Sequence, residues 1–318
     1  MTSSFSLANC GDGEAPDVLQ NHGMVGTLPA MGAQGQKRMP PHVSSAAVLT
    51  DAVGRRHAPA GEGARIVSLV PSITELLFDL GLGGNVVGRT AFCVHPRGSV
   101  RRAQSVGGTK QVDLDKLRRL EPTHVIVNID ETPRQLADDL AALGYDVVVT
   151  HPIAVHDNIV LYRLMGALFG RQEEAEALCR RFLAAYNAVE EVARFMPDQA
   201  VLYLIWKDPW MTVSPATYIS RMLALIHWRT VPESASVRYP VVDLDDKTLA
   251  GCERVLFSSE PFPFKERHAE EFRRAHPAHA GKAALIDAQM VSWYGSRAIA
   301  GLDYLRRLAS AGRPLPLG

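Results

Sequence analysis

The chain has 318 residues, of which 47% are hydrophobic, and its 34 Lys and Arg residues balance 34 Asp and Glu residues. This length and composition allow one large core or two medium ones. The balanced charge argues against a nucleic-acid-binding stripe, and no apolar run reaches the roughly 18 residues that a membrane span needs.

Residues 1–64 differ in composition from the rest of the chain. They are rich in Gly, Pro, Ser, Ala and His and show neither a helical nor a strand period, so we expect this extension to be mostly disordered. A secretory signal has a charged start, an apolar centre of roughly 7–15 residues and a small-residue cleavage site. The best apolar candidate, Ser45–Leu49, is too short. As written, the protein is therefore expected to stay in the cytoplasm.

Short strands and helices alternate from Arg65 onward. Arg65–Val70 predicts a buried strand, and Ser72 followed three residues later by Glu75 forms a capping-box pattern that predicts a helix start. Further strands are expected over 85–90, 124–129 and 146–150, and further helices over 113–120 and 132–144. This alternation predicts a mostly parallel sheet with helices on both faces. We assign this N-terminal α/β lobe to residues 65–170.

The longest helical pattern runs from Gln172 to Phe195 and predicts a connecting helix within residues 171–196. At about 1.5 Å per residue such a helix would be roughly 36 Å long, enough to bridge two domains. Alternating elements then resume over 200–206, 218–228, 243–249, 254–259, 265–275, 283–288 and 296–309. They predict a C-terminal α/β lobe over residues 197–312. The expected fold is α/β, with two Rossmann-like lobes of mostly parallel sheets joined by one long rigid helix.

Ligands of open parallel sheets bind beyond the carboxyl ends of the strands, so the residues at these ends are candidate ligand-binding residues. In the first lobe they are Pro71, Ser72, Phe92, His95, Asp130 and Glu131. In the second lobe they are Trp206, Trp210, Glu260, Phe262, Trp293, Tyr294 and Arg297. Aromatic side chains at these positions suit a flat, partly apolar ligand. The alternative is that they cover the sheet edge as part of the core.

Neither a resident cofactor nor a resident metal site is expected. His95 and His151 are candidate axial ligands for the metal of a bound chelate, and the alternative is that each is a hydrogen-bonded loop histidine. The sequence contains no Gly-x-Ser-x-Gly elbow, Walker loop or His-Glu-x-x-His, so we do not expect an enzyme. An enzyme that reuses Lys110, Glu131, Glu260 and Arg297 stays open as an alternative.

Several segments resemble a known family. Arg65–Glu75, Val106–Lys110 and Leu120–Ile126 are similar to the Fe/B12-type periplasmic binding domain. Ile205–Thr212, Arg238–Pro240, Ser258–Lys265 and Ser292–Arg297 are similar to its branch of helical backbone metal receptors, or cobalamin-binding proteins. The resemblance covers about residues 65–309. It implies one ligand held between two lobes with little hinge closure. Lys110, at the end of one of these segments, is a further candidate ligand-binding residue.

The resemblance also implies a function and partners. It implies a monomeric substrate-binding protein that delivers a cobalamin-like ligand or a ferric or other metal chelate to an ABC importer, in the periplasm if exported. Asp115 and Asp245 match the positions where the family usually has a Glu that docks onto permease arginines; the alternative is aspartates stabilised at helix starts. The sequence departs from the family around Thr109 and over Ile226–Val231, so the ligand's identity is not carried over. A cytoplasmic corrinoid or metal-chelate carrier or sensor is the alternative function.

Overall fold

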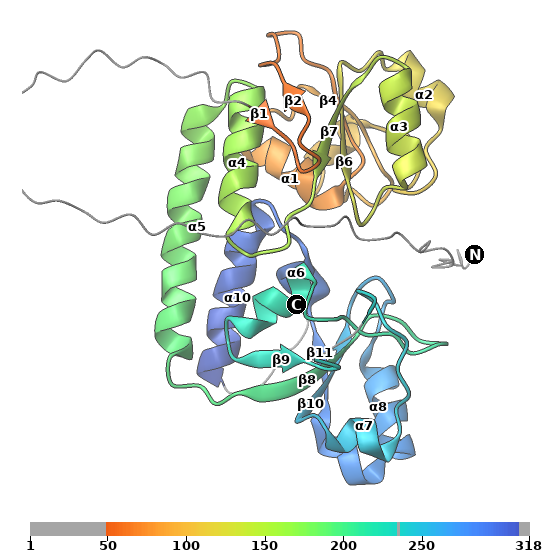
Figure 1. Ribbon diagram of the computed structural model, residues 1–318, viewed down its shortest axis with the longest axis vertical. Helices are drawn as coiled ribbons and strands as arrows, with labels where there is room; N and C mark the ends of the chain where they lie inside the picture. Colours follow the sequence, from red (N-terminus) through yellow and green to blue (C-terminus); the bar gives the residue numbers. More distant parts are fainter. Residues whose placement is uncertain (1–48, 234–235, 312–318) are drawn as a thin grey trace, which may run out of the picture. The chain divides into compact units, whose positions relative to one another are not determined.

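The computed structural model describes residues 49–233 and 236–311. Two α/β lobes follow one another along the chain (Figure 1). The first lobe has a sheet of order β5-β4-β3-β6-β7, and the second has a sheet of order β11-β10-β8-β9. The strands are β3 (Ile66–Ser68), β4 (Val86–Arg89), β5 (Gln104–Ser105), β6 (His124–Asn128), β7 (Asp146–Thr150), β8 (Gln199–Leu204), β9 (Trp228–Thr230), β10 (Arg254–Ser258) and β11 (Ala283–Ile286). All their pairings in both sheets are parallel, which confirms the predicted fold class.

Both faces of the first sheet are buried. Ile126 of β6 belongs to one hydrophobic cluster, whereas its neighbours Val125 and Val127 belong to another. Successive side chains of a strand point to opposite faces, so helices must cover both. The helices of this lobe are α1 (Pro71–Asp79), the 3₁₀ helix η1 (Ser99–Arg102), α2 (Leu114–Arg119), α3 (Arg134–Ala142) and α4 (Asp157–Leu168). Helix α4 was not among the predicted elements.

The second lobe is built in the same way around its own sheet. Its helices are α6 (Tyr218–Ala224), α7 (Asp246–Ala250), α8 (Glu266–Ala275), the 3₁₀ helix η2 (Pro277–Lys282), α9 (Ala288–Ser292) and α10 (Arg297–Ala311). Residues 218–228, expected to form one element, instead contain helix α6 and the start of strand β9. The chain changes direction between them at His227, which has a φ of 60°. Within the described ranges, no helix has the length and apolar content that crossing a membrane requires.

Helix α5 (Gln172–Ala193) joins the lobes and packs side by side with α4 and α10 (Figure 1). The contact with α4 is close: a Cβ added at Gly166 would lie 2.5 Å from the Cβ of Ala175. One hydrophobic cluster extends from Leu76 in the first lobe through Phe182 of α5 to Tyr203 in the second. The connecting helix is therefore part of a shared core, and it ends two residues before the predicted Phe195.

Residues 49–57 form an antiparallel hairpin of β1 (Leu49–Thr50) and β2 (Arg56–His57). The buried Asp51 carboxylate accepts hydrogen bonds from the backbone N–H groups of Arg55 and Val149. The His57 Nδ1 lies 2.7 Å from an Asp146 carboxylate oxygen. The expected disorder is thus wrong for residues 49–64, in which the side chains of Asp51 and His57 contact β7. Residues 1–48, with the expected absence of a signal, lie outside the described residues.

The predicted capping box at the start of α1 is also wrong. The helix begins at Pro71, with Val70 as its N-cap and no side-chain cap. Proline suits the first helical position because its φ is already helical and it has no N–H to satisfy. Ser72 lies inside the first turn, and Glu75 pairs with Arg297 instead of capping.

Candidate ligand site

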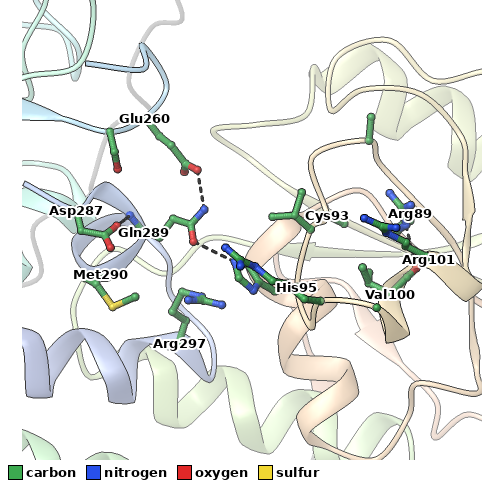
Figure 2. A pocket seen from close by; sticks show the side chains of 15 residues that line it. Arg89, Cys93, His95, Val100, Arg101, Glu260, Asp287, Gln289, Met290 and Arg297 are labelled. Carbon is green, nitrogen blue, oxygen red and sulfur yellow. Dashed lines mark hydrogen bonds between the residues drawn. The ribbon is translucent and has the colours of Figure 1, made fainter. Parts of the chain in front are cut away.

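A cleft of about 990 Å³ lies between the two lobes, at the carboxyl ends of β4, β10 and β11 (Figure 2). Its first-lobe wall includes Arg89, Cys93, His95, Arg97 and Arg101. Its second-lobe wall includes Glu260, Asp287, Gln289, Met290 and Arg297. Parallel sheets direct these loops toward one another, so a single ligand can contact both lobes.

A hydrogen-bonded chain crosses the cleft from His95 to Glu260 (Figure 2). The His95 Nε2 lies 3.1 Å from Oε1 of Gln289, whose Nε2 donates to Oε1 of Glu260 at 2.8 Å. Because the glutamine amide donates to the carboxylate, its oxygen faces the imidazole and accepts the His95 Nε2 proton. The neutral ring then keeps its lone pair on Nδ1, the nitrogen that remains able to bind a metal.

Trp293 supports this chain from the second lobe without lining the cleft. Its indole N–H donates to Oε2 of Glu260 at 3.1 Å, and its ring meets His95 edge to face with centroids 5.6 Å apart. The Arg297 guanidinium lies 5.2 Å from the Trp293 ring centroid. Both oxygens of Glu260 are thereby engaged, and His95 is held by a hydrogen bond and a T-shaped aromatic contact.

Other predicted ligand residues form direct contacts between the lobes, which we call the interlobe seam: Tyr294–Glu131 and Arg297–Glu75. The Tyr294 hydroxyl donates to Oε1 of Glu131 at 2.9 Å. Arg297 forms a two-point ion pair with Glu75, at 2.7 and 2.6 Å, and the two side chains are only 12% and 15% exposed. These groups hold the two lobes together, so most of their hydrogen-bonding atoms already have partners within the protein.

Backbone packing continues the contact beside the seam. Gly295 has a φ of 78°, and a Cβ there would lie 3.1 Å from the carbonyl oxygen of Ser72. Only glycine adopts this conformation freely and allows so close an approach. Ser72 therefore contacts the second lobe through its backbone, while Pro71 occupies the first position of α1.

Two neighbouring carboxyl groups of the first lobe, those of Asp130 and Glu131, have shifted pKa values. Burial raises the pKa of Glu131 to about 7, the charges of Asp130 and Glu260 add to the rise, and the Tyr294 hydroxyl opposes it. Burial also tends to raise the pKa of Asp130, but its hydrogen bond with His151 and the charge of Arg238 bring it below its usual value. Glu131 is therefore close to half protonated at neutral pH, whereas Asp130 is ionised.

The remaining predicted ligand residues do not line the cleft. Trp210 stacks on Phe264 with centroids 6.0 Å apart and planes 9° apart, as part of the core cover. Trp206 meets Phe262 edge to face at 5.7 Å. Phe92 is exposed beside the cleft loop, and Lys110 is exposed in the turn after β5. For Trp210 and Phe262 the structure favours the core alternative.

The two proposed docking aspartates occupy different helix positions. Asp245 is the N-cap of α7 and accepts a hydrogen bond from the Thr248 N–H at 2.7 Å. In α2 the N-cap is Asp113, whereas Asp115 lies in the first turn and pairs with Arg118 at 3.0 Å. Asp115 and Asp245, which the resemblance treats as equivalent, therefore differ by two positions relative to the start of their helices.

Sequence reasoning missed most of the cleft wall. It named His95, Glu260 and Arg297, but not the arginines that follow β4 or the Gln289–Met290 pair in α9. The arginines had a usable signal, because they are concentrated in one segment without acidic residues. Gln289 and Met290 had none, since a short amphipathic helix after a strand predicts no ligand contact.

Known proteins that are similar to this chain in sequence or structure are binding proteins. The profile of the periplasmic binding protein family matches residues 66–245. A vitamin B12-binding protein of Yersinia pestis is 24% identical over 185 residues, covering 58% of this chain, and the match spans only 65% of that relative's length. The periplasmic vitamin B12 binding protein of Vibrio cholerae superposes with a TM-score of 0.69 at 16% identity, over 79% of this chain and 98% of its own. A periplasmic heme-binding protein of Roseiflexus superposes with a TM-score of 0.68 at 20% identity, over 78% and 98%.

These structural relatives share the fold, and their names describe binding proteins rather than enzymes. Because the family profile covers more than half of the sequence, this chain belongs to the periplasmic binding protein family.

Proposed function

We propose that this protein is the substrate-binding component of an ABC importer and that its ligand is a cobalamin-like, haem-like or ferric chelate. The interlobe cleft is the observation that carries the proposal: about 990 Å³ between the carboxyl ends of two parallel sheets. Protein ligand sites run from roughly 300 to 1,000 Å³, so this one suits a ligand at the large end of the range.

The chemistry of the cleft wall favours a metal chelate within that size class. His95 presents an imidazole whose orientation is set by Gln289 and Trp293. A metal that arrives with its own chelator needs only one or two further donors from the protein, and imidazole suits both cobalt and iron. Relatives named for vitamin B12 and for heme support the same ligand class.

Ligand titration tests the proposal. Hydroxocobalamin, hemin and a ferric hydroxamate are each titrated into the full chain while tryptophan fluorescence is followed, because Trp293 lies directly behind the cleft wall. We expect saturable quenching by one of the three ligands. The His95→Ala variant should bind that ligand about tenfold or more weakly and change its visible spectrum, as loss of an axial donor would. His279→Ala, on η2 and outside the cleft wall, is the matched control. Failure of all three ligands to bind contradicts the proposal.

Delivery to a permease is a separate part of the proposal. Asp115→Asn and Asp245→Asn remove the two charges, and asparagine still caps α7. We expect the double variant to lose cellular uptake of the ligand while its affinity in solution stays unchanged; Asp138→Asn, on the exposed side of α3, is the control. Cell fractionation accompanies this test, since an intact chain found only in the cytosol would contradict the importer role.

A further inference from the structure

The first-lobe wall of the cleft has a surplus of positive charge. Asp79 and Asp113 enclose a segment that contains no Asp or Glu. Its five basic residues are Arg89, Arg97, Arg101, Arg102 and Lys110. The first three of these line the cleft, so the excess of basic residues in this segment places positive charge on one wall of the cleft.

The three cleft arginines differ in how they are engaged. Arg89 donates hydrogen bonds to the carbonyl oxygens of Val100 and Thr90, at 3.0 and 2.8 Å, and so holds the loop that contains η1. Arg97 and Arg101 are exposed, and within the described ranges neither forms an ion pair. They are therefore the cations that remain available to a ligand.

The acidic residues of the opposite wall form no ion pair with Arg97 or Arg101. The cleft is lined by four arginines and two carboxylates. Glu260 accepts hydrogen bonds from Gln289 and Trp293, and Asp287 caps α9 by accepting the backbone N–H of Gln289. Both carboxylates are thus engaged by donors of their own lobe. Arg297 has its partner in Glu75, so Arg97 and Arg101 are the cleft-lining arginines without a hydrogen-bonded partner among the described residues.

We infer that Arg97 and Arg101 bind ionised carboxylates at the periphery of the ligand, so that the cleft selects a planar chelate bearing carboxylate side chains over an amide-substituted, uncharged one. This inference rests on the proposed function and narrows it. Guanidinium groups form two-point hydrogen bonds with carboxylates, which gives both strength and orientation. His95 lies on the same loop, so one segment supplies the metal donor and the groups that hold the periphery.

Three probes test the inference on the full chain. They are hemin, which has two free carboxylates, hemin dimethyl ester, in which both are blocked, and hydroxocobalamin, whose ring carries amides. We expect hemin to bind about tenfold more tightly than its ester at low salt, with a preference that declines as ionic strength rises. The variant Arg97→Gln/Arg101→Gln should bind hemin about tenfold more weakly and leave the affinity for the ester unchanged.

Arg102→Gln is the matched control, because Arg102 is exposed next to Arg101 and does not line the cleft. Thermal unfolding of each variant shows whether it is folded. Equal affinity of the wild-type protein for hemin and its ester, equal losses for both ligands in the double variant, or tighter binding of hydroxocobalamin than of hemin would each overturn this inference and leave the proposed function standing. Binding of no chelate at all would overturn both.

Discussion

At the scale of single residues, Glu131 couples the interlobe seam to pH. Burial raises the pKa of its carboxyl to about 7, against 4.5 for a glutamate in water. The folded protein therefore keeps this proton at pH values where the unfolded chain has lost it. Folding stability from this group is fully present below about pH 4.5 and is lost as the pH rises through about 7.

The variant Glu131→Gln should remove this dependence. Glutamine still accepts the Tyr294 hydroxyl and cannot ionise, so the variant should gain stability relative to wild type between about pH 5 and about pH 8. The gain is on the order of 1–3 kcal/mol, since each unit of pKa shift corresponds to about 1.4 kcal/mol. Urea denaturation at the two pH values measures it, with Asp138→Asn as the exposed control. A stability difference that is the same at both pH values would show that Glu131 does not titrate in this range.

Residue types at strand ends predict the position of the cleft well. They predict the role of each side chain at the cleft less well. His95, Glu260 and Arg297 line the cleft, but Arg297 is held by a carboxylate 222 positions earlier in the chain. Such a partner is invisible to local sequence patterns, because only the packing of α10 beside α1 brings the two together. Tyr294 and Glu131 were predicted to contact the ligand, but in the structure they bond to each other. The reason is the same, because they too are brought together only by tertiary packing.

At the scale of elements, the β1–β2 hairpin depends on one buried carboxylate. Asp51 accepts the N–H groups of Val53 and Arg55 in its own turn and that of Val149 in β7. Asp51→Ala removes all three hydrogen bonds and leaves the buried Val149 N–H without a partner, and a buried unsatisfied donor costs about 1–3 kcal/mol. We expect the free energy of unfolding to fall by about 2–4 kcal/mol in denaturant titrations. Glu62→Ala, at an exposed position of the same segment, is the control; an equal effect there would contradict the anchoring role of Asp51.

The sequence predicts elements well where a hydrophobic period and a stop signal coincide, as for β6, β7 and α5. The sequence does not predict elements whose formation depends on tertiary contacts. The β1–β2 hairpin has too few residues for a period, and β9 is a strand of three residues that pairs with β8 only after His227 has turned the chain. The start of α1 was misassigned because Ser72 and Glu75 have the spacing of a capping box, yet both are used in contacts with the second lobe.

At the scale of the whole described unit, the two lobes share one core. The hydrophobic cluster that includes α5 contains residues of both sheets, and α10 packs against both α5 and α1. Two lobes linked only by a helix would be free to unfold separately. A continuous core couples them, since exposing the inner face of one lobe also exposes the face that it covers on the other.

The ion pair between Glu75 and Arg297 tests this coupling, because it joins α1 to α10 at the edge of the shared core. We expect wild-type protein to unfold in one transition, with coincident curves from tryptophan fluorescence, which reports the second lobe, and from far-ultraviolet circular dichroism, which reports both lobes.

The variant Arg297→Gln leaves the nearly buried Glu75 carboxylate without a cation and should lower the free energy of unfolding by about 3 kcal/mol. The variant Arg163→Gln breaks an exposed pair with Glu176 and should lower it by less than about 1 kcal/mol. In the double variant Glu75→Gln/Arg297→Gln the cost should be smaller than the sum of the single changes, because no unpaired charge remains. Separate fluorescence and dichroism transitions in the wild-type protein would show that the lobes unfold independently and that the shared core does not couple them.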